Sequence, residues 1–150
     1  MIIGNLVSRI LRPNLDAMKA KWDVDGLIRA LDHGDYRIRK GAAEALGEMK
    51  AIQAVGALVR ALKDENSDVR RAAAQALGGI GDDRAVGALV EALRDESIDV
   101  RMEAARALKK LSFRRVGELP LLVSRHLNIP MKKALKVVEG LKEGKFDFLK

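Results

Sequence analysis

The chain has 150 residues, of which 28 are Lys or Arg and 21 are Asp or Glu, and its formal net charge is +7. It contains no cysteine, which excludes a disulfide framework and a thiolate metal site. No segment approaches the roughly 20 consecutive apolar residues that a membrane-spanning helix requires, and the first residues lack the pattern of a secretion signal. We therefore expect a single cytoplasmic domain comprising residues 1–150.

The amino-terminal segment, residues 1–22, predicts two short helices. Apolar residues recur at helical spacing before Pro13, and a second helix is expected over residues 15–21. We expect this segment to cap the units that follow, because the first unit of a repeat array lacks a neighbour on one side. A second reading stays open, in which the helix before Pro13 lies on a membrane surface with Arg9 and Arg12 at its edge.

Three copies of one 31-residue sequence follow, over residues 23–53, 54–84 and 85–115. The second and third copies are identical at 18 of 31 aligned positions, and the first copy keeps their pattern of apolar residues. A fixed period of this length is typical of a solenoid, in which each unit buries its apolar face only against its neighbours.

Each copy predicts two antiparallel helices. In the middle copy, apolar residues at helical spacing predict the first helix over residues 54–63. The second helix is expected to start after Asn66, which aligns with Asp35 and Ser97 in the other copies. All three residue types are good N-caps, because a short side-chain oxygen reaches a free backbone N–H of the first turn.

Small residues occupy the expected helix contacts and the expected end of the second helices. Ala73 and Ala104 occupy positions that we expect to be buried, where a small side chain lets two helices approach closely. Gly78, Gly79 and Gly81 are predicted to end the second helix of the middle copy, because glycine favours the left-handed conformation that terminates helices.

Residues 116–150 depart from the repeat, and we expect them to form a helical cap. One helix is predicted over residues 116–127 with Pro120 in its first turn, and another from Pro130 to about residue 142. The aromatic tail from Phe146 to Leu149 either folds back onto this cap or docks onto another copy or a partner.

The segment from Asn66 to Leu89 combines a Val-Arg pair, an alanine-rich helix, a Gly-Asp turn and an Ala-Val pair. This pattern resembles the short HEAT-like repeat of phycobilisome-lyase-type and archaeal HEAT proteins, over about three repeats. The resemblance implies an all-α fold, a right-handed α-solenoid of stacked antiparallel helix pairs with helical caps at both ends. It also implies that Arg39, Arg70 and Arg101 pair with acidic residues of an adjacent loop and that the second helices line the concave side.

The resemblance and the variable surface of the second helices favour a non-enzymatic protein–protein interaction or scaffold module. The exposed positions of these helices differ between the copies while the buried positions do not, which is expected of a specific surface on a standard frame. We predict partner binding at these positions: Lys40, Glu44, Arg71, Gln75, Met102 and Arg106.

Nucleic-acid binding is the alternative, because the charge is unevenly distributed. Residues 1–100 carry 15 basic against 16 acidic side chains, whereas residues 101–150 carry 13 against 5. The basic carboxy-terminal third could contact phosphates, although the only tryptophan, Trp22, lies far from it and leaves no evident platform for base stacking. The candidate phosphate-binding residues are Lys109, Lys110, Arg114, Arg115, Lys132 and Lys133.

No pattern in the sequence indicates catalysis, a metal or a cofactor. His33 and His126 are the only histidines and neither is followed by glutamate, unlike the His-Glu pairs of iron-binding HEAT enzymes. Nucleophile-elbow, phosphate-loop and dinucleotide motifs are absent. A lyase-type subunit that handles a tetrapyrrole remains a third reading, which rests on the resemblance alone. We expect a protein partner, with self-association through the termini left open.

Overall fold

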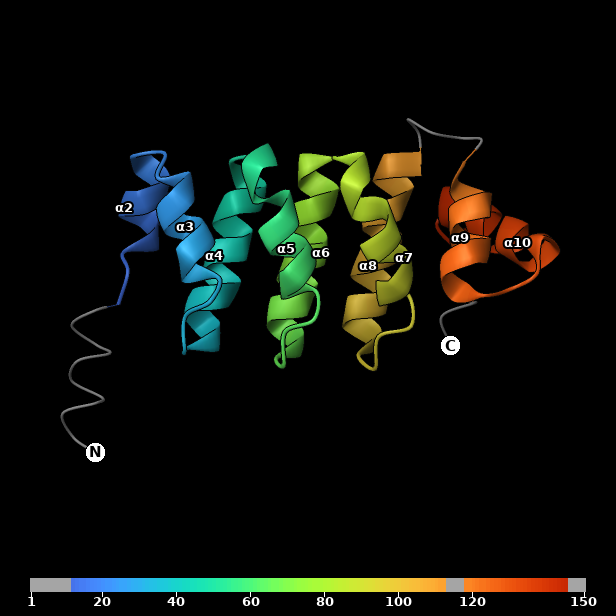
Figure 1. The fold of residues 1–150 in the computed structure, drawn as a ribbon, viewed down its shortest axis with the longest axis horizontal. Coiled ribbons are helices and arrows are strands. Elements are labelled where there is room, and N and C mark those ends of the chain that lie inside the picture. The colour runs from blue at the N-terminus through green and yellow to red at the C-terminus, as the bar shows by residue number, and fades with distance from the viewer. Residues whose placement is uncertain (1–11, 113–117, 146–150) are drawn as a thin grey trace.

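The computed structural model describes residues 12–112 and 118–145, which form helices joined by short loops (Figure 1). The helix expected before Pro13 and the tail from Phe146 to Leu149 lie outside these residues. The α-helices are α2 Leu15–Ala20, α3 Val24–Ala30, α4 Tyr36–Glu48, α5 Val55–Ala61, α6 Ser67–Ile80, α7 Val86–Ala92, α8 Ile98–Ser112, α9 Leu119–Leu127 and α10 Met131–Glu143. Two short 3-10 helices, η1 Ile52–Ala54 and η2 Asp83–Ala85, lead directly into α5 and α7.

The helices stack in one row of pairs, with α2 and α3 at one end and α9 and α10 at the other (Figure 1). Helices α3, α5 and α7 are the first helices of the three repeats, and each contacts its own second helix, α4, α6 or α8. The second helices also contact one another directly, α4 against α6 and α6 against α8. The prediction of an all-α solenoid of helix pairs is therefore confirmed.

The predicted N-caps lie where the second helices begin. The Asp35 side chain accepts the Arg37 N–H at the start of α4, and the Asn66 side chain accepts the N–H groups of Asp68 and Val69 at the start of α6. Helix α8 begins at the residue after Ser97. The first helix of the middle repeat is shorter than expected, because Ala54 belongs to the 3-10 turn η1 and the helix ends at Ala61.

One continuous hydrophobic core runs through all the helix pairs, from Val24 in α3 to Leu141 in α10. Its largest members recur at the repeat spacing and are fully buried: Leu27, Leu58 and Leu89 in the first helices, and Leu46, Leu77 and Leu108 in the second helices. Each repeat thus contributes the same leucines to a shared core, as expected of a solenoid.

Two glycines of α6 lie inside the helix, so the prediction that they end it is wrong. Helix α6 continues through Gly78 and Gly79 to Ile80, and only Gly81, with φ of 75°, adopts the left-handed conformation that ends it. A Cβ on Gly78 would lie 2.8 Å from the Cβ and 2.9 Å from the Cα of Ala107 in α8. Gly78 therefore serves close helix packing, a demand that sequence alone does not distinguish from helix termination.

The same close contact recurs one repeat earlier. A Cβ on Gly47 in α4 would lie 2.7 Å from the Cα of Ala76 in α6. The predicted small contact residues Ala73 and Ala104 are also fully buried. Small residues thus hold consecutive second helices at close range along the row.

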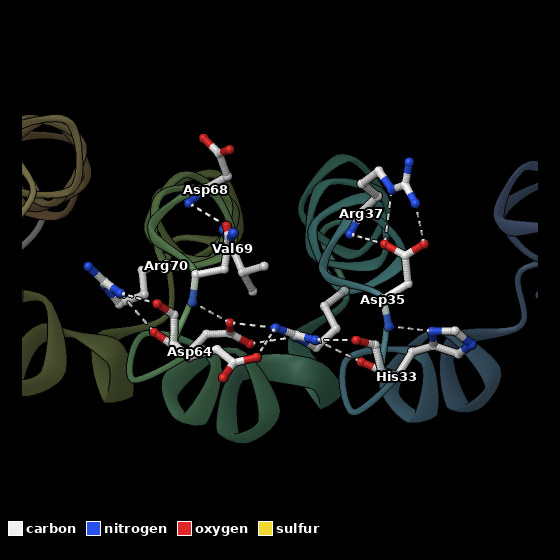
Figure 2. Close-up of polar contacts among 11 residues, drawn as sticks. His33, Asp35, Arg37, Asp64, Asp68, Val69 and Arg70 are labelled. Atoms are coloured by element: carbon white, nitrogen blue, oxygen red, sulfur yellow. Dashed lines mark hydrogen bonds and ion pairs between the residues drawn. The ribbon is translucent and has the colours of Figure 1, made fainter. Parts of the chain in front are cut away.

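A ladder of buried arginines joins consecutive repeats (Figure 2). Arg39, which is 7% exposed, binds the Asp64 carboxylate of the next repeat with two hydrogen bonds of 2.7 and 2.9 Å. Arg70 binds Asp95 in the same way, at 2.8 and 3.0 Å, and also donates to the backbone carbonyl of Asp64 at 2.9 Å. The pairing that the family resemblance implied for these two arginines is present, and Arg101 repeats the carbonyl contact at Asp95.

The ladder changes the acidity of Asp64. Burial raises the pKa of this carboxyl. Hydrogen bonds from Arg39 and from the Asn66 N–H, together with the charge of Arg70, lower the pKa by more than burial raises it, so the net pKa lies below its ordinary value. The carboxylate is therefore held in its charged form by the interface between repeats.

The two carboxy-terminal helices continue the stack as a further pair. Helix α9, with Pro120 in its first turn as predicted, packs against α7, and α10 packs against both α9 and α8. Their buried residues belong to the same core as the repeats. The repeat pattern fades in this part of the sequence, but the helix-pair architecture persists.

The first prediction tests the register of the repeats. Leu77→Ala should lower the free energy of unfolding by about 2–5 kcal/mol, because it leaves a cavity in the fully buried centre of the stack. Gln75→Ala, on the exposed side of the same helix, should change it by less than about 0.5 kcal/mol. Urea unfolding followed by circular dichroism measures both. Equal losses for the two variants would show that the assigned faces of α6 are wrong.

The second prediction concerns neighbouring glycines with opposite responses. Gly78→Ala should destabilise the protein, because the new methyl group meets the backbone of α8. Gly79→Ala should stabilise it by up to about 1 kcal/mol through the better helix propensity of alanine, since its Cβ would meet only the Gly47 carbonyl at 3.6 Å. Thermal unfolding of both variants checks this. A stabilising Gly78→Ala would mean that the two helices are not in close contact.

The third prediction concerns pH. Because folding lowers the pKa of Asp64, the folded state binds this proton less readily than the unfolded state. The resulting stabilisation is present above the unfolded pKa of about 3.9 and is lost as the pH falls through the lower, folded value. Asp64→Asn should therefore be less stable than wild type at neutral pH and should lose less stability on acidification to about pH 3. Identical pH profiles in urea unfolding would contradict the charged pairing.

Candidate partner-binding face on the second helices

The predicted partner-binding residues form two rows across three helices. Lys40, Arg71 and Met102 occupy one repeat position on α4, α6 and α8 and are half-buried. The second row, one helical turn further on, consists of the exposed residues Glu44, Gln75 and Arg106. Because α4 contacts α6 and α6 contacts α8, the structure places both rows on one continuous face.

The charged residues of this face are held mainly by neighbours on their own helices. Lys40 lies 3.7 Å from Glu44, and Arg106 lies 3.1 Å from Glu103. Arg71 lies 3.8 Å from Asp68. Exposed pairs of this kind are worth little to stability, so a partner can replace them at small cost.

A shallow groove of about 360 Å³ crosses the same face. Glu44 and Glu48 of α4 line one side of it, and Lys110 of α8 lies at the other. Gln75 contributes from α6 between them. The groove therefore has two glutamates at one end, Glu48 paired with Lys19 of α2 and Glu44 with Lys40, and a lysine at the other.

The floor of the groove is made of small residues. Ala72, Ala76 and Gly79 of α6, together with Gly47 of α4, form it. Gly79 aligns with Glu48 and Lys110 at the repeat spacing, so these three residues make a third row, one turn beyond the second. The middle member of this row has no side chain, which is why the surface is hollow between the two charged ends.

Sequence analysis missed the residues of this third row as parts of one face. Glu48 was not selected, Gly79 was interpreted as a helix end, and Lys110 was grouped with the phosphate-binding candidates. The signal was available, because adding one helical turn to Glu44, Gln75 and Arg106 gives this row.

The candidate phosphate-binding residues are spread over two helices. Lys109 is half-buried in the last turn of α8, and its Nζ would lie 3.1 Å from a Cβ on Gly144, at the end of α10. Lys132 and Lys133 are exposed in the first turn of α10. This turn lies roughly 18 Å along the helix from Gly144, at 1.5 Å per residue. Lys110 lines the groove, and Arg114 and Arg115 lie outside the described residues.

The two histidines have structural neighbours. His33 accepts the Asp35 N–H through Nδ1 at 3.0 Å, at the repeat position where Asp64 accepts the Asn66 N–H (Figure 2). The Nε2 of His126 lies close against Gly87, in the contact between α9 and α7. Within residues 12–112 and 118–145, no group of three or more acidic or histidine side chains is arranged to bind a metal. In that same part of the chain, no helix has the length and apolarity needed to cross a bilayer.

Comparison with known proteins identifies the family. The sequence pattern of HEAT repeats matches residues 24–109 and, in a second register, residues 57–126. No curated protein matches the chain in sequence. A solved structure, the complex of CpcE and CpcF of phycocyanin lyase from Nostoc sp. PCC7120, is similar with a TM-score of 0.57 and 35% sequence identity. That match covers 59% of this chain and only 37% of the lyase chain. Because the HEAT pattern spans well over half of the sequence and the helix pairs stack as described, the chain belongs to the HEAT-repeat family.

Proposed function

We propose that the protein is a non-enzymatic scaffold that binds a protein partner on the face formed by α4, α6 and α8. The observation that carries the proposal is the groove between Glu48 and Lys110, which crosses the variable surface of all three second helices. The frame beneath it is uniform, with the same buried leucines and alanines in each repeat. The repeats thus differ mainly at the surface residues of the second helices, above a core that is the same in each repeat.

The charges of the groove suggest the chemistry of the partner. A segment that presents a basic side chain to Glu44 and Glu48 and an acidic side chain to Lys110 would be complementary to it. The floor of glycine and alanine admits close approach by a helix or an extended strand of the partner, because few side chains project from it.

Similarity to the phycocyanin lyase complex supports a protein partner, because that structure is an assembly of two chains, CpcE and CpcF. We do not extend the lyase reaction to this chain. The match spans 37% of the lyase chain, so most of that chain lies outside the similarity. The shared property that we propose is the use of stacked repeats as a surface for assembly.

The fourth prediction tests this face by charge reversal. Lys40→Glu, Arg71→Glu and Arg106→Glu combined should abolish recovery of the partners that wild type captures from native lysate. The substitutions turn attraction at two half-buried positions and one exposed position into repulsion while the core is unchanged. Gly79→Gln should also weaken recovery without changing charge, because the new side chain fills the groove between Glu48 and Lys110. Quantitative mass spectrometry of the captured proteins is the measurement.

The matched control carries the same charge change elsewhere. Arg29→Glu, Arg60→Glu and Lys63→Glu lie on or just after the first helices α3 and α5 and are exposed. This variant should recover the same partners as wild type. Circular dichroism verifies that all variants are folded. Equal recovery by the wild type, both face variants and the control would refute the assigned face.

A further inference from the structure

The last helix of the stack presents an apolar stripe to solvent. Met131 and Leu135 of α10 are 42% and 52% exposed, although both are large apolar residues. Leu135 and Val138 line a groove of about 550 Å³ together with Pro120 of α9. Figure 1 shows α9 and α10 at the end of the row, where no described helix lies beyond them.

The spacing of this stripe matches the seam of a helix pair. Met131, Leu135, Val138 and Lys142 follow one another at intervals of four, three and four residues; Val138 is buried in the core, so Met131, Leu135 and Lys142 are the exposed members. Such spacing keeps one edge of a helix facing a second helix along its whole length. The stem of Lys142 can cover apolar surface at the end of the seam while its ammonium group stays in water.

A charged stripe runs beside the apolar one. Lys132, Lys136, Glu139 and Glu143 share one side of α10, at intervals of four, three and four residues. The two lysines are neighbours at i and i+4, and so are the two glutamates, which is unfavourable in an isolated helix. Among the described residues, Lys132, Lys136 and Glu139 form no ion pair, and Glu143 pairs only with Lys145 beyond the helix end, at 2.8 Å.

This order of charges is complementary to itself when the helix is reversed. In an antiparallel pair of two α10 helices centred between Val137 and Val138, Lys132 of one copy faces Glu143 of the other. In the same arrangement Lys136 faces Glu139, and the two-fold axis repeats both contacts. Every like-charge neighbour within the helix thereby gains an opposite charge across the interface.

We propose that α10 is a self-association surface, on which a second copy of this chain packs its own α10 antiparallel across a two-fold axis. The apolar seam through Leu135 supplies the contact, and the two lysines and two glutamates set its direction. With one helix and the edge of α9 from each copy, the interface belongs to the small, reversible class. The dimer should therefore form at micromolar or higher concentrations and weaken with added salt.

Sedimentation velocity of the full chain between about 1 and 500 µM tests the proposal. Wild type should show a concentration-dependent monomer–dimer equilibrium. Leu135→Asp should be monomeric throughout, and because Leu135 is already half-exposed its replacement should leave the fold intact. Lys132→Glu with Lys136→Glu, and separately Glu139→Lys with Glu143→Lys, should each raise the dimer dissociation constant by at least about tenfold, since four attractive contacts become repulsive.

Mixing the two charge variants gives the sharpest result. One presents four glutamates on the stripe and the other presents four lysines, so an equimolar mixture should form a heterodimer that neither forms alone. The control, Arg60→Glu with Lys63→Glu, has the same charge change as the first variant on another part of the molecule and should dimerise like wild type.

Three outcomes would overturn the proposal. Wild type that stays monomeric over the whole range would show that the stripe is not used between copies, as would be expected if residues 146–150 of the same chain covered it. A dimer that persists in Leu135→Asp would place the interface elsewhere. A mixture of the two charge variants that remains monomeric would refute the antiparallel arrangement.

Discussion

The close approach of consecutive second helices is the constraint on which the rest of this structure depends. Gly47 lies against Ala76, and Gly78 lies against Ala107, with no room for one additional carbon atom at either contact. At this separation the buried leucines of neighbouring repeats belong to one continuous core. The candidate binding face results from the same packing, because α4, α6 and α8 present their outer sides together.

The arginine ladder fixes the register between consecutive repeats, which apolar packing alone does not. Apolar contacts between helices tolerate small shifts of one helix along another. The bidentate ion pair of Arg39 with Asp64 requires a specific geometry. Arg70 forms an equivalent bond one repeat later, and its remaining donors satisfy the loop carbonyls beside it. Each unit is thus held in register with the next through its loop as well as through its helices. Removing one member would leave an uncompensated charge in a nearly closed site.

The two surfaces that we propose for binding differ in their chemistry. The face of the second helices is polar, with Glu48 at one end of its groove and Lys110 at the other, which suits a reversible partner of complementary charge. The end of the stack at α10 exposes Met131 and Leu135 beside a row of lysines and glutamates, which suits a second helix that packs lengthwise. These surfaces lie on different helices, except that α8 also contacts α10. In the two proposals, the partner and the second copy therefore occupy different surfaces.

The amino-acid sequence by itself determined the architecture, because a 31-residue period imposes helix pairs that can bury their apolar faces only against one another. It also determined the N-caps at Asp35 and Asn66, since capping depends on groups within a few residues. Of the candidate face, the rows through Lys40 and Glu44 were predictable from the alignment of the copies. The role of Gly78 and Gly79 was not, because a glycine has the same local preferences whether it ends a helix or admits a neighbour. Only the tertiary structure, which brings Ala107 against Gly78 and opens a groove above Gly79, decided between the two.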